Sequence, residues 1–115
     1  MKLTWLGQAG FRIELGGVCI VVDPWASPHE LRLAPPPPWA VVAEGIDWVL
    51  VTHEHLDHLD PPVLRLAVER SPTARVVIPG AIAPKRLGTT TWRRPAARSA
   101  VAPGATVFPA KPSQW

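Results

Sequence analysis

Alternation of apolar and polar residues predicts three short strands at the start of the chain. Residues 2–6 alternate enough to form a strand, and residues 11–15 alternate with a period of two, as a half-buried strand does. Gly16-Gly17 is a strong hairpin turn signal. Residues 18–22 are a continuous apolar run rich in β-branched residues, which is typical of a strand covered on both faces. We therefore expect a three-stranded antiparallel meander.

A strand-helix-strand unit follows a proline-rich loop. Residues 25–45 are predicted to be a loop, because their four consecutive prolines can supply neither ladder donors nor helix interior. Residues 46–51 form the next buried strand, and Asp60 is a good N-cap for an amphipathic helix over residues 62–69. A strand over residues 75–78 completes the unit, which we expect to be a right-handed parallel crossover.

The pattern weakens after Gly88. Residues 81–87 are compatible with a short helix, and residues 101–107 with a turn into one last strand. Residues 109–115 are predicted to be a disordered tail. Residues 1–108 therefore form one partial domain in this interpretation.

Composition adds few constraints. The apolar content of 47% is ordinary for a globular protein, and no apolar run approaches the roughly 18 residues of a membrane span. No export signal is visible at the start of the chain. The single cysteine, Cys19, lies in an apolar strand run, so we interpret it as a buried structural thiol. These features predict a cytoplasmic protein without a membrane span.

Charge is distributed unevenly. Residues 1–69 hold four basic residues and all nine acids, a net of −5, whereas residues 70–115 hold eight basic residues and no acid, a net of +8. The basic residues are scattered and lack interleaved aromatic residues, so nucleic-acid binding is disfavoured. A solvated face or a surface for an acidic partner is the favoured interpretation, and attraction of an anionic substrate is a lesser one.

Four potential metal ligands follow the strand over residues 46–51: His53, His55, Asp57 and His58. Positions two apart in an extended segment point the same way, so His53 and His55 can share one metal ion. Asp57 and His58 point differently, which suits them to a second ion. Imidazole nitrogen and carboxylate oxygen are suitable ligands for Zn²⁺, Fe or Mn²⁺. A surface histidine near a helix start explains any one of them, but explains all four together poorly.

Asp23 leaves two interpretations open. Because Pro24 follows it, this aspartate can simply cap a turn, and that is the favoured interpretation. The alternative is that its carboxylate receives a hydrogen bond from a ligand histidine or from the loop that bears the cluster. His29, alone in the proline-rich loop, is interpreted as a solvated side chain.

These segments together resemble a known family. Residues 52–60, Thr-His-Glu-His-Leu-Asp-His-Leu-Asp, resemble the His-x-His-x-Asp-His signature of the metallo-β-lactamase superfamily. Residues 4–14 and 21–24 look like its opening strands. With residues 77–80, they are most similar to the branch that contains ascorbate-6-phosphate lactonase. The resemblance runs from about residue 2 to about residue 107, and it is specific for the superfamily but not for a substrate.

The resemblance implies an α/β (α+β) fold, namely the N-terminal half of an αββα sandwich with a mixed sheet and one or two flanking helices. By carry-over, His53 and His55 hold the first metal ion, and Asp57 and His58 hold the second. Zn²⁺ is the first choice, with Mn²⁺ or Fe as alternatives. A metal-bound hydroxide, oriented by Asp57 as the catalytic residue, would hydrolyse a lactone, ester or phosphodiester in a small-molecule substrate.

The family's later ligands have no counterpart in this sequence, which contains no histidine after His58 and no aspartate after Asp60. We therefore expect a truncated hydrolase with little or no activity alone, and a bare inner sheet face. Such a face implies a homo-oligomer, a complementary chain or a poorly folded fragment. The alternative is a non-catalytic metal-binding or assembly module derived from the same fold. Nucleic-acid binding ranks last.

Overall fold

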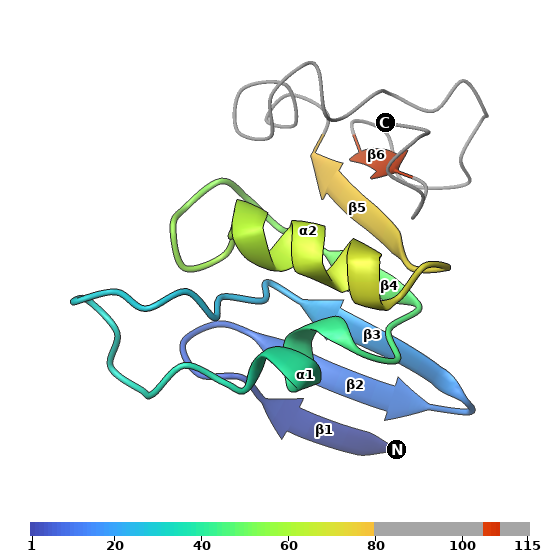
Figure 1. Ribbon diagram of the computed structural model, residues 1–115, viewed down its shortest axis with the longest axis horizontal. Coiled ribbons are helices and arrows are strands. Elements are labelled where there is room, and N and C mark those ends of the chain that lie inside the picture. The colour runs from blue at the N-terminus through green and yellow to red at the C-terminus, as the bar shows by residue number, and fades with distance from the viewer. Residues whose placement is uncertain (80–104, 109–115) are drawn as a thin grey trace.

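The computed structural model describes residues 1–79 and 105–108, which form a mixed sheet with two helices on one of its faces (Figure 1). The elements, in chain order, are β1 (Lys2–Trp5), β2 (Phe11–Leu15), β3 (Val18–Val22), α1 (Trp39–Ala43), β4 (Trp48–Leu50), α2 (Pro61–Arg70), β5 (Arg75–Pro79) and β6 (Ala105–Phe108). The α+β class and the mixed sheet with flanking helices are confirmed.

The strands lie side by side in chain order, from β1 to β6. Strands β1, β2 and β3 are antiparallel neighbours, which confirms the predicted meander. Strands β3, β4 and β5 are parallel, and α2 connects β4 to β5. Strand β6 is antiparallel to β5. Because β3 and β4 are parallel, the segments that follow them leave the sheet at the same edge, where open sheets commonly bind ligands.

The core lies between the sheet and the two helices. Val21, Val49 and Val76 are directly paired across β3, β4 and β5, and all three are fully buried. Helix α2 covers them with residues spaced three or four apart, as an amphipathic helix does. Its buried residues are Val63, Leu64, Ala67 and Val68. Burial of this apolar ridge is the main favourable contribution to the stability of the unit.

The opposite face of the sheet is also apolar but carries neither helix. Leu3 and Trp5 on β1 are 57% and 60% exposed. Their partners on β2 are Ile13 and Phe11, which extend the same face because paired residues point to the same side of a sheet. The described residues thus present to solvent an apolar sheet surface of the kind that the sequence predicts.

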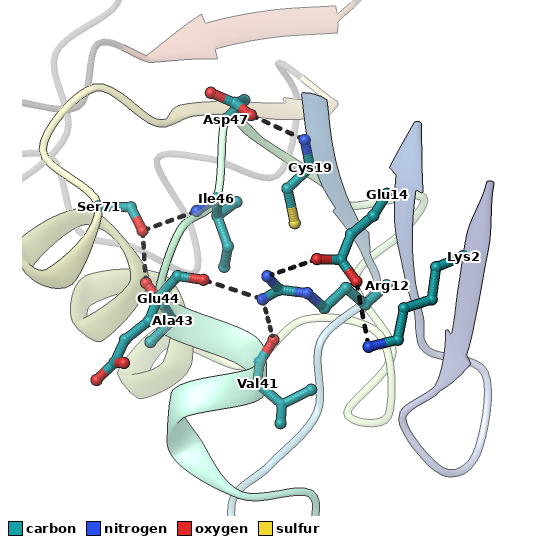
Figure 2. Close-up of polar contacts among 10 residues, drawn as sticks. All are labelled: Lys2, Arg12, Glu14, Cys19, Val41, Ala43, Glu44, Ile46, Asp47 and Ser71. Atoms are coloured by element: carbon teal, nitrogen blue, oxygen red, sulfur yellow. Dashed lines mark hydrogen bonds and ion pairs between the residues drawn. The ribbon is translucent and has the colours of Figure 1, made fainter. Parts of the chain in front are cut away.

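Helix α1 corrects the prediction that residues 25–45 are a loop throughout. It follows the prolines directly, with Pro38 at its N-cap, and it buries Val42 and Ala43 against the core. The guanidinium of Arg12, on β2, donates hydrogen bonds to the backbone carbonyls of Val41 and Glu44 at the end of this helix (Figure 2). The positively charged guanidinium thus supplies hydrogen-bond donors to carbonyls at the helix C-terminus, which have no partner within the helix.

Helix α2 begins at Pro61, and Asp60 occupies its N-cap as expected. The carboxylate of Asp60, however, makes no capping hydrogen bond to the helix. The predicted cap is wrong in this respect: Pro61 and Pro62 leave fewer N–H groups in the first turn, and the carboxylate accepts the N–H groups of Ala26 and Ser27 instead. Strand β4 is shorter than the predicted strand over residues 46–51.

Buried polar contacts join the helices to each other and to the sheet. Ser71, just after α2, donates its hydroxyl to the carbonyl of Ala43 at 2.6 Å and accepts the N–H of Ile46 at 3.0 Å. The carboxylate of Asp47 accepts the backbone N–H of Cys19 at 2.8 Å (Figure 2). Residues 44–47 are therefore held at both ends, which fixes where β4 enters the sheet.

Cys19 is buried, as predicted, and burial raises the pKa of its thiol, so the unreactive neutral form is favoured. Of the remaining predictions, the helix over residues 81–87 and the tail over residues 109–115 lie outside the described residues. Within the described ranges, neither helix has the length and apolar character needed to span a bilayer.

We predict that Ser71→Ala destabilises the fold by about 1–3 kcal/mol, because it leaves the buried N–H of Ile46 and carbonyl of Ala43 without this partner. Urea unfolding followed by tryptophan fluorescence measures the change. Thr73→Ala, at an exposed position two residues away, is the matched control. Equal stability of the two variants would contradict the structural role of the Ser71 hydroxyl.

Candidate metal centre

The predicted ligands lie in the connection between β4 and α2, beside the segment that follows β3. Val22 and Leu50, the last residues of β3 and β4, are paired. The N–H of Asp23 continues this pairing by donating to the carbonyl of Leu50 at 2.8 Å. The parallel register therefore places Asp23 next to Thr52, the residue that precedes the histidine cluster.

The carboxylate of Asp23 is the polar centre of this edge. Its side chain is almost completely enclosed, since Asp23 is only 3% exposed. One oxygen, Oδ1, accepts the N–H of Thr52 at 2.8 Å, and the other, Oδ2, accepts the Thr52 hydroxyl at 2.7 Å. Oδ2 also lies 2.8 Å from Nδ1 of His58. Three donors thus surround a buried carboxylate, which offsets the cost of removing it from water.

The backbone around Asp23 is shaped for this contact. Asp23 has a φ of 45°, in the left-handed region that aspartate tolerates better than most residues. Gly10 lies against it, and a Cβ added at Gly10 would be 2.8 Å from the Asp23 carbonyl oxygen. The turn between β1 and β2 therefore needs a glycine at this point so that the chain can bend after β3.

The hydrogen bonds set the tautomers of two histidines. The Thr52 hydroxyl donates its one hydrogen to Asp23, so it can only accept from Nδ1 of His53, which is 2.8 Å away. A carboxylate likewise can only accept from Nδ1 of His58. For neutral imidazoles we therefore assign the Nδ1–H tautomer to both rings, which leaves each Nε2 with a free lone pair. This is the arrangement of a histidine metal ligand supported by a carboxylate.

The connection folds back and brings the rings of His55 and His58 close to that of His53. A turn with hydrogen bonds from the N–H groups of His58 and Leu59 to the carbonyl of His55 reverses the chain. The ring of His53 consequently lies between two others, with centroid separations of 4.6 Å to His55 and 3.8 Å to His58. The cluster is formed by one local turn together with the contact to Asp23.

Asp57 and His58 face each other as two ligands of one ion would. Oδ2 of Asp57 lies 3.5 Å from Nε2 of His58. Tetrahedral zinc with bonds of about 2.0–2.1 Å separates neighbouring ligand atoms by roughly 3.3 Å. Both the distance and the atom types therefore fit a divalent cation, with the nitrogen that His58 has free.

The arrangement is nevertheless incomplete. In the described ranges, no three or more His, Cys, Asp or Glu side chains are placed to hold a metal ion as they stand. His53 and His55 meet edge to face, with an interplanar angle of 77°, so their nitrogens must turn to converge on one ion. The residues fit a divalent cation by donor type and by the supported tautomers, with rearrangement required at the first pair.

Sequence reasoning assigned no role to Thr52. Its hydroxyl connects His53 to Asp23, and its position directly before the first histidine was the available signal. His29, interpreted as a solvated side chain, is partly exposed and makes local contacts. Its Nδ1 accepts the N–H of Leu31, and its ring lies 5.8 Å from that of the buried Trp25.

Comparison with known proteins places most of the chain in one family. Residues 2–100 match the model of the family described as "Beta-lactamase superfamily domain". A "UPF0173 metal-dependent hydrolase" of Aeropyrum pernix is 43% identical over 58 residues, which are 50% of this chain and 22% of the relative. A protein of the same name from Chelativorans sp. is 46% identical over 59 residues, 51% of this chain and 24% of the relative.

The similarity to these relatives is local. A third "UPF0173 metal-dependent hydrolase", from Pyrobaculum aerophilum, is 35% identical over 63 residues, 55% of this chain and 27% of the relative. The matched part of the chain thus spans about a quarter of the length of these curated relatives. No solved structure matches the chain.

We predict that Asp23→Asn removes the tautomer preference of His58, because an amide nitrogen at the position of Oδ2 cannot accept from Nδ1–H. Imidazole ¹⁵N chemical shifts of the metal-free chain measure the proportion of the Nδ1–H form. Asp47→Asn, which changes the carboxylate that binds the Cys19 N–H, is the matched control. An unchanged His58 signal in Asp23→Asn would contradict the assigned hydrogen bond.

Proposed function

Because the chain belongs to the beta-lactamase superfamily, we propose that its histidine-rich connection is the metal-binding part of a metal-dependent hydrolase. The observation that supports this most directly is the buried carboxylate of Asp23, which accepts hydrogen bonds consistent with free Nε2 atoms on His53 and His58. The relatives named above are called metal-dependent hydrolases, in agreement with this proposal.

In this proposal His53 and His55 hold a first divalent ion, and Asp57 and His58 hold a second. The donor set of imidazole nitrogens and one carboxylate favours Zn²⁺, with Mn²⁺ or Fe as alternatives. Divalent ions bound there supply Lewis acidity and lower the pKa of water towards neutrality. Asp23 is not one of the proposed ligands; it orients the imidazoles through its contacts with Thr52 and His58.

Asp57 is the proposed catalytic residue. Its side chain is 38% exposed and lies beside Nε2 of His58, so one part of the carboxylate faces the ring and another can face a substrate. A carboxylate in this position can accept a hydrogen bond from a water molecule and direct its lone pair towards a carbonyl or phosphoryl centre. The proposed substrates are small lactones, esters or phosphodiesters. An anionic substrate is consistent with the net +8 of residues 70–115.

The two ligands proposed for each ion are fewer than the three protein ligands of typical catalytic zinc sites. We therefore expect weak binding and little turnover by this chain alone. The apolar sheet face that includes Leu3 and Trp5 is the proposed contact surface of a homo-oligomer or a complementary chain. The cytoplasmic location also stays a prediction.

A non-catalytic metal-binding or assembly module is the second candidate, favoured by the incomplete ligand arrangement. The two candidates differ in one result. Turnover of a chromogenic ester, lactone or phosphodiester by the metal-loaded protein, lost in Asp57→Asn, would identify the hydrolase. Metal binding without turnover, even with a partner chain present, would identify the module.

We predict that the chain binds Co²⁺, used as a spectroscopic substitute for Zn²⁺, and that His53→Ala weakens binding at least tenfold. Loss of a supporting partner alone typically costs about 10–100-fold in metal affinity, so loss of a ligand costs at least as much. Titration followed by visible absorption measures the affinity. His29→Ala, in the proline-rich loop, is the control. Equal affinities of the two variants would exclude His53 as a ligand.

A further inference from the structure

A second buried carboxylate lies at the other end of the histidine-rich connection. Asp60 is 4% exposed, and its carboxylate accepts hydrogen bonds from the segment that follows β3. Oδ2 accepts the N–H groups of Ala26 and Ser27 at 3.1 and 2.9 Å, and Oδ1 accepts the Ser27 hydroxyl at 2.9 Å. Three hydrogen bonds thus compensate the buried charge.

The prolines at the start of α2 reduce the number of capping donors that the helix offers this carboxylate. An aspartate at an N-cap normally accepts the N–H of the second or third helical residue. Here the first two helical residues, Pro61 and Pro62, have no N–H. Only the N–H of the third helical residue, Val63, is left for a cap, and both oxygens of Asp60 instead bind residues 26 and 27.

The two carboxylates connect the same pair of segments in opposite directions. Asp23 extends from residues 23–27 to Thr52, at the start of the connection. Asp60 extends from the end of the connection back to Ser27. Both segments leave the same edge of the sheet, after β3 and after β4 (Figure 1). The ligand-bearing turn is thereby fixed at its beginning and at its end.

Asp60 is close in the sequence to the proposed ligands. His58 precedes it by two residues, and the residue between them, Leu59, is buried in the core. With Leu59 and Asp60 both fixed, the backbone of His58 has little freedom, and its ring meets Asp23 on one side and Asp57 on the other. Release of Asp60 would remove the polar contact that fixes the end of the turn, so that His58 would be held there only by the burial of Leu59 and by its own bond to Asp23.

We infer that Asp60 is a positioning residue of the metal centre, which acts by bonding Ser27 and so holds His58 and Asp57 in place; this inference rests on the proposed metal-binding function. Its carboxylate binds Ala26 and Ser27 rather than His58 or Asp57, so its effect passes through the backbone of the turn. The pair formed by Asp60 and Ser27 therefore contributes to metal affinity as well as to stability.

The test compares Asp60→Asn with Asp47→Asn, a matched change to another carboxylate that binds a backbone N–H. We expect Asp60→Asn to weaken Co²⁺ binding about 10–100-fold and to alter the visible spectrum, because a supporting group is lost. We expect Asp47→Asn to bind Co²⁺ within about twofold of the affinity of the unmodified chain. This holds even if its unfolding midpoint shifts as much as that of Asp60→Asn. Equal affinities of the two variants would overturn the inference.

Ser27→Ala keeps the inference testable if Asp60→Asn does not fold. It removes one hydrogen bond to Asp60 and retains both backbone donors, so a smaller loss in the same direction is expected. Unchanged Co²⁺ affinity and an unchanged spectrum in this variant would count against the inference.

Failure of the proposed metal-binding function can be distinguished from failure of the positioning role of Asp60. If the unmodified chain binds no Co²⁺, the metal-binding proposal fails, and the positioning role is then judged in the metal-free chain. A change in the His58 imidazole ¹⁵N shifts of Asp60→Asn or Ser27→Ala, absent from Asp47→Asn, would support positioning. Shifts that match those of Asp47→Asn would overturn it.

Discussion

The candidate site depends on one buried carboxylate. A carboxylate that is withdrawn from water must be surrounded by hydrogen-bond donors, and Asp23 finds them in the backbone and hydroxyl of Thr52 and in the ring of His58. The same hydrogen bonds determine which imidazole nitrogens carry protons. Satisfying the carboxylate therefore also fixes the orientation of the His58 ring.

The sheet makes this contact possible. Parallel pairing of Val22 with Leu50 places the end of β3 beside the end of β4, although Asp23 and His58 are 35 residues apart in the sequence. The close approach of Gly10 allows the chain to bend after β3. The hydrophobic core fixes the register because Val21 and Val49, one residue before each strand end, are both fully buried.

Local patterns were sufficient to predict much of this arrangement. The strands over residues 11–15 and 18–22 were predicted with their observed bounds. Their pattern did not predict which side is buried: Phe11 and Leu15 lie on the exposed face of β2, and Val18 is 42% exposed although β3 was expected to be covered on both faces. The clustering of His53, His55, Asp57 and His58 follows from close sequence spacing. Helix α1 was missed because its five residues carry almost no periodic signal and its last carbonyls are bonded by Arg12, from β2.

Contacts between distant segments could not be predicted in the same way. The sequence left the role of Asp23 open between a turn cap and a hydrogen bond to the cluster, and the parallel register decides which donors reach it. Asp60 was predicted as a helix cap from its position, but its carboxylate bonds residues 26 and 27. In both cases the carboxylate has several potential hydrogen-bond partners, and the tertiary structure determines which of them it binds.

The measurement that tests this account most directly is proton NMR of the Co²⁺-loaded chain with ¹⁵N-labelled histidine. Coordination through Nε2 leaves Nδ1–H in place, so the account predicts hyperfine-shifted, solvent-exchangeable signals from Nδ1–H of His53 and His58. Exchangeable signals that arise from Nε2–H instead, or an absence of any hyperfine-shifted imidazole signal at saturating Co²⁺, would contradict it.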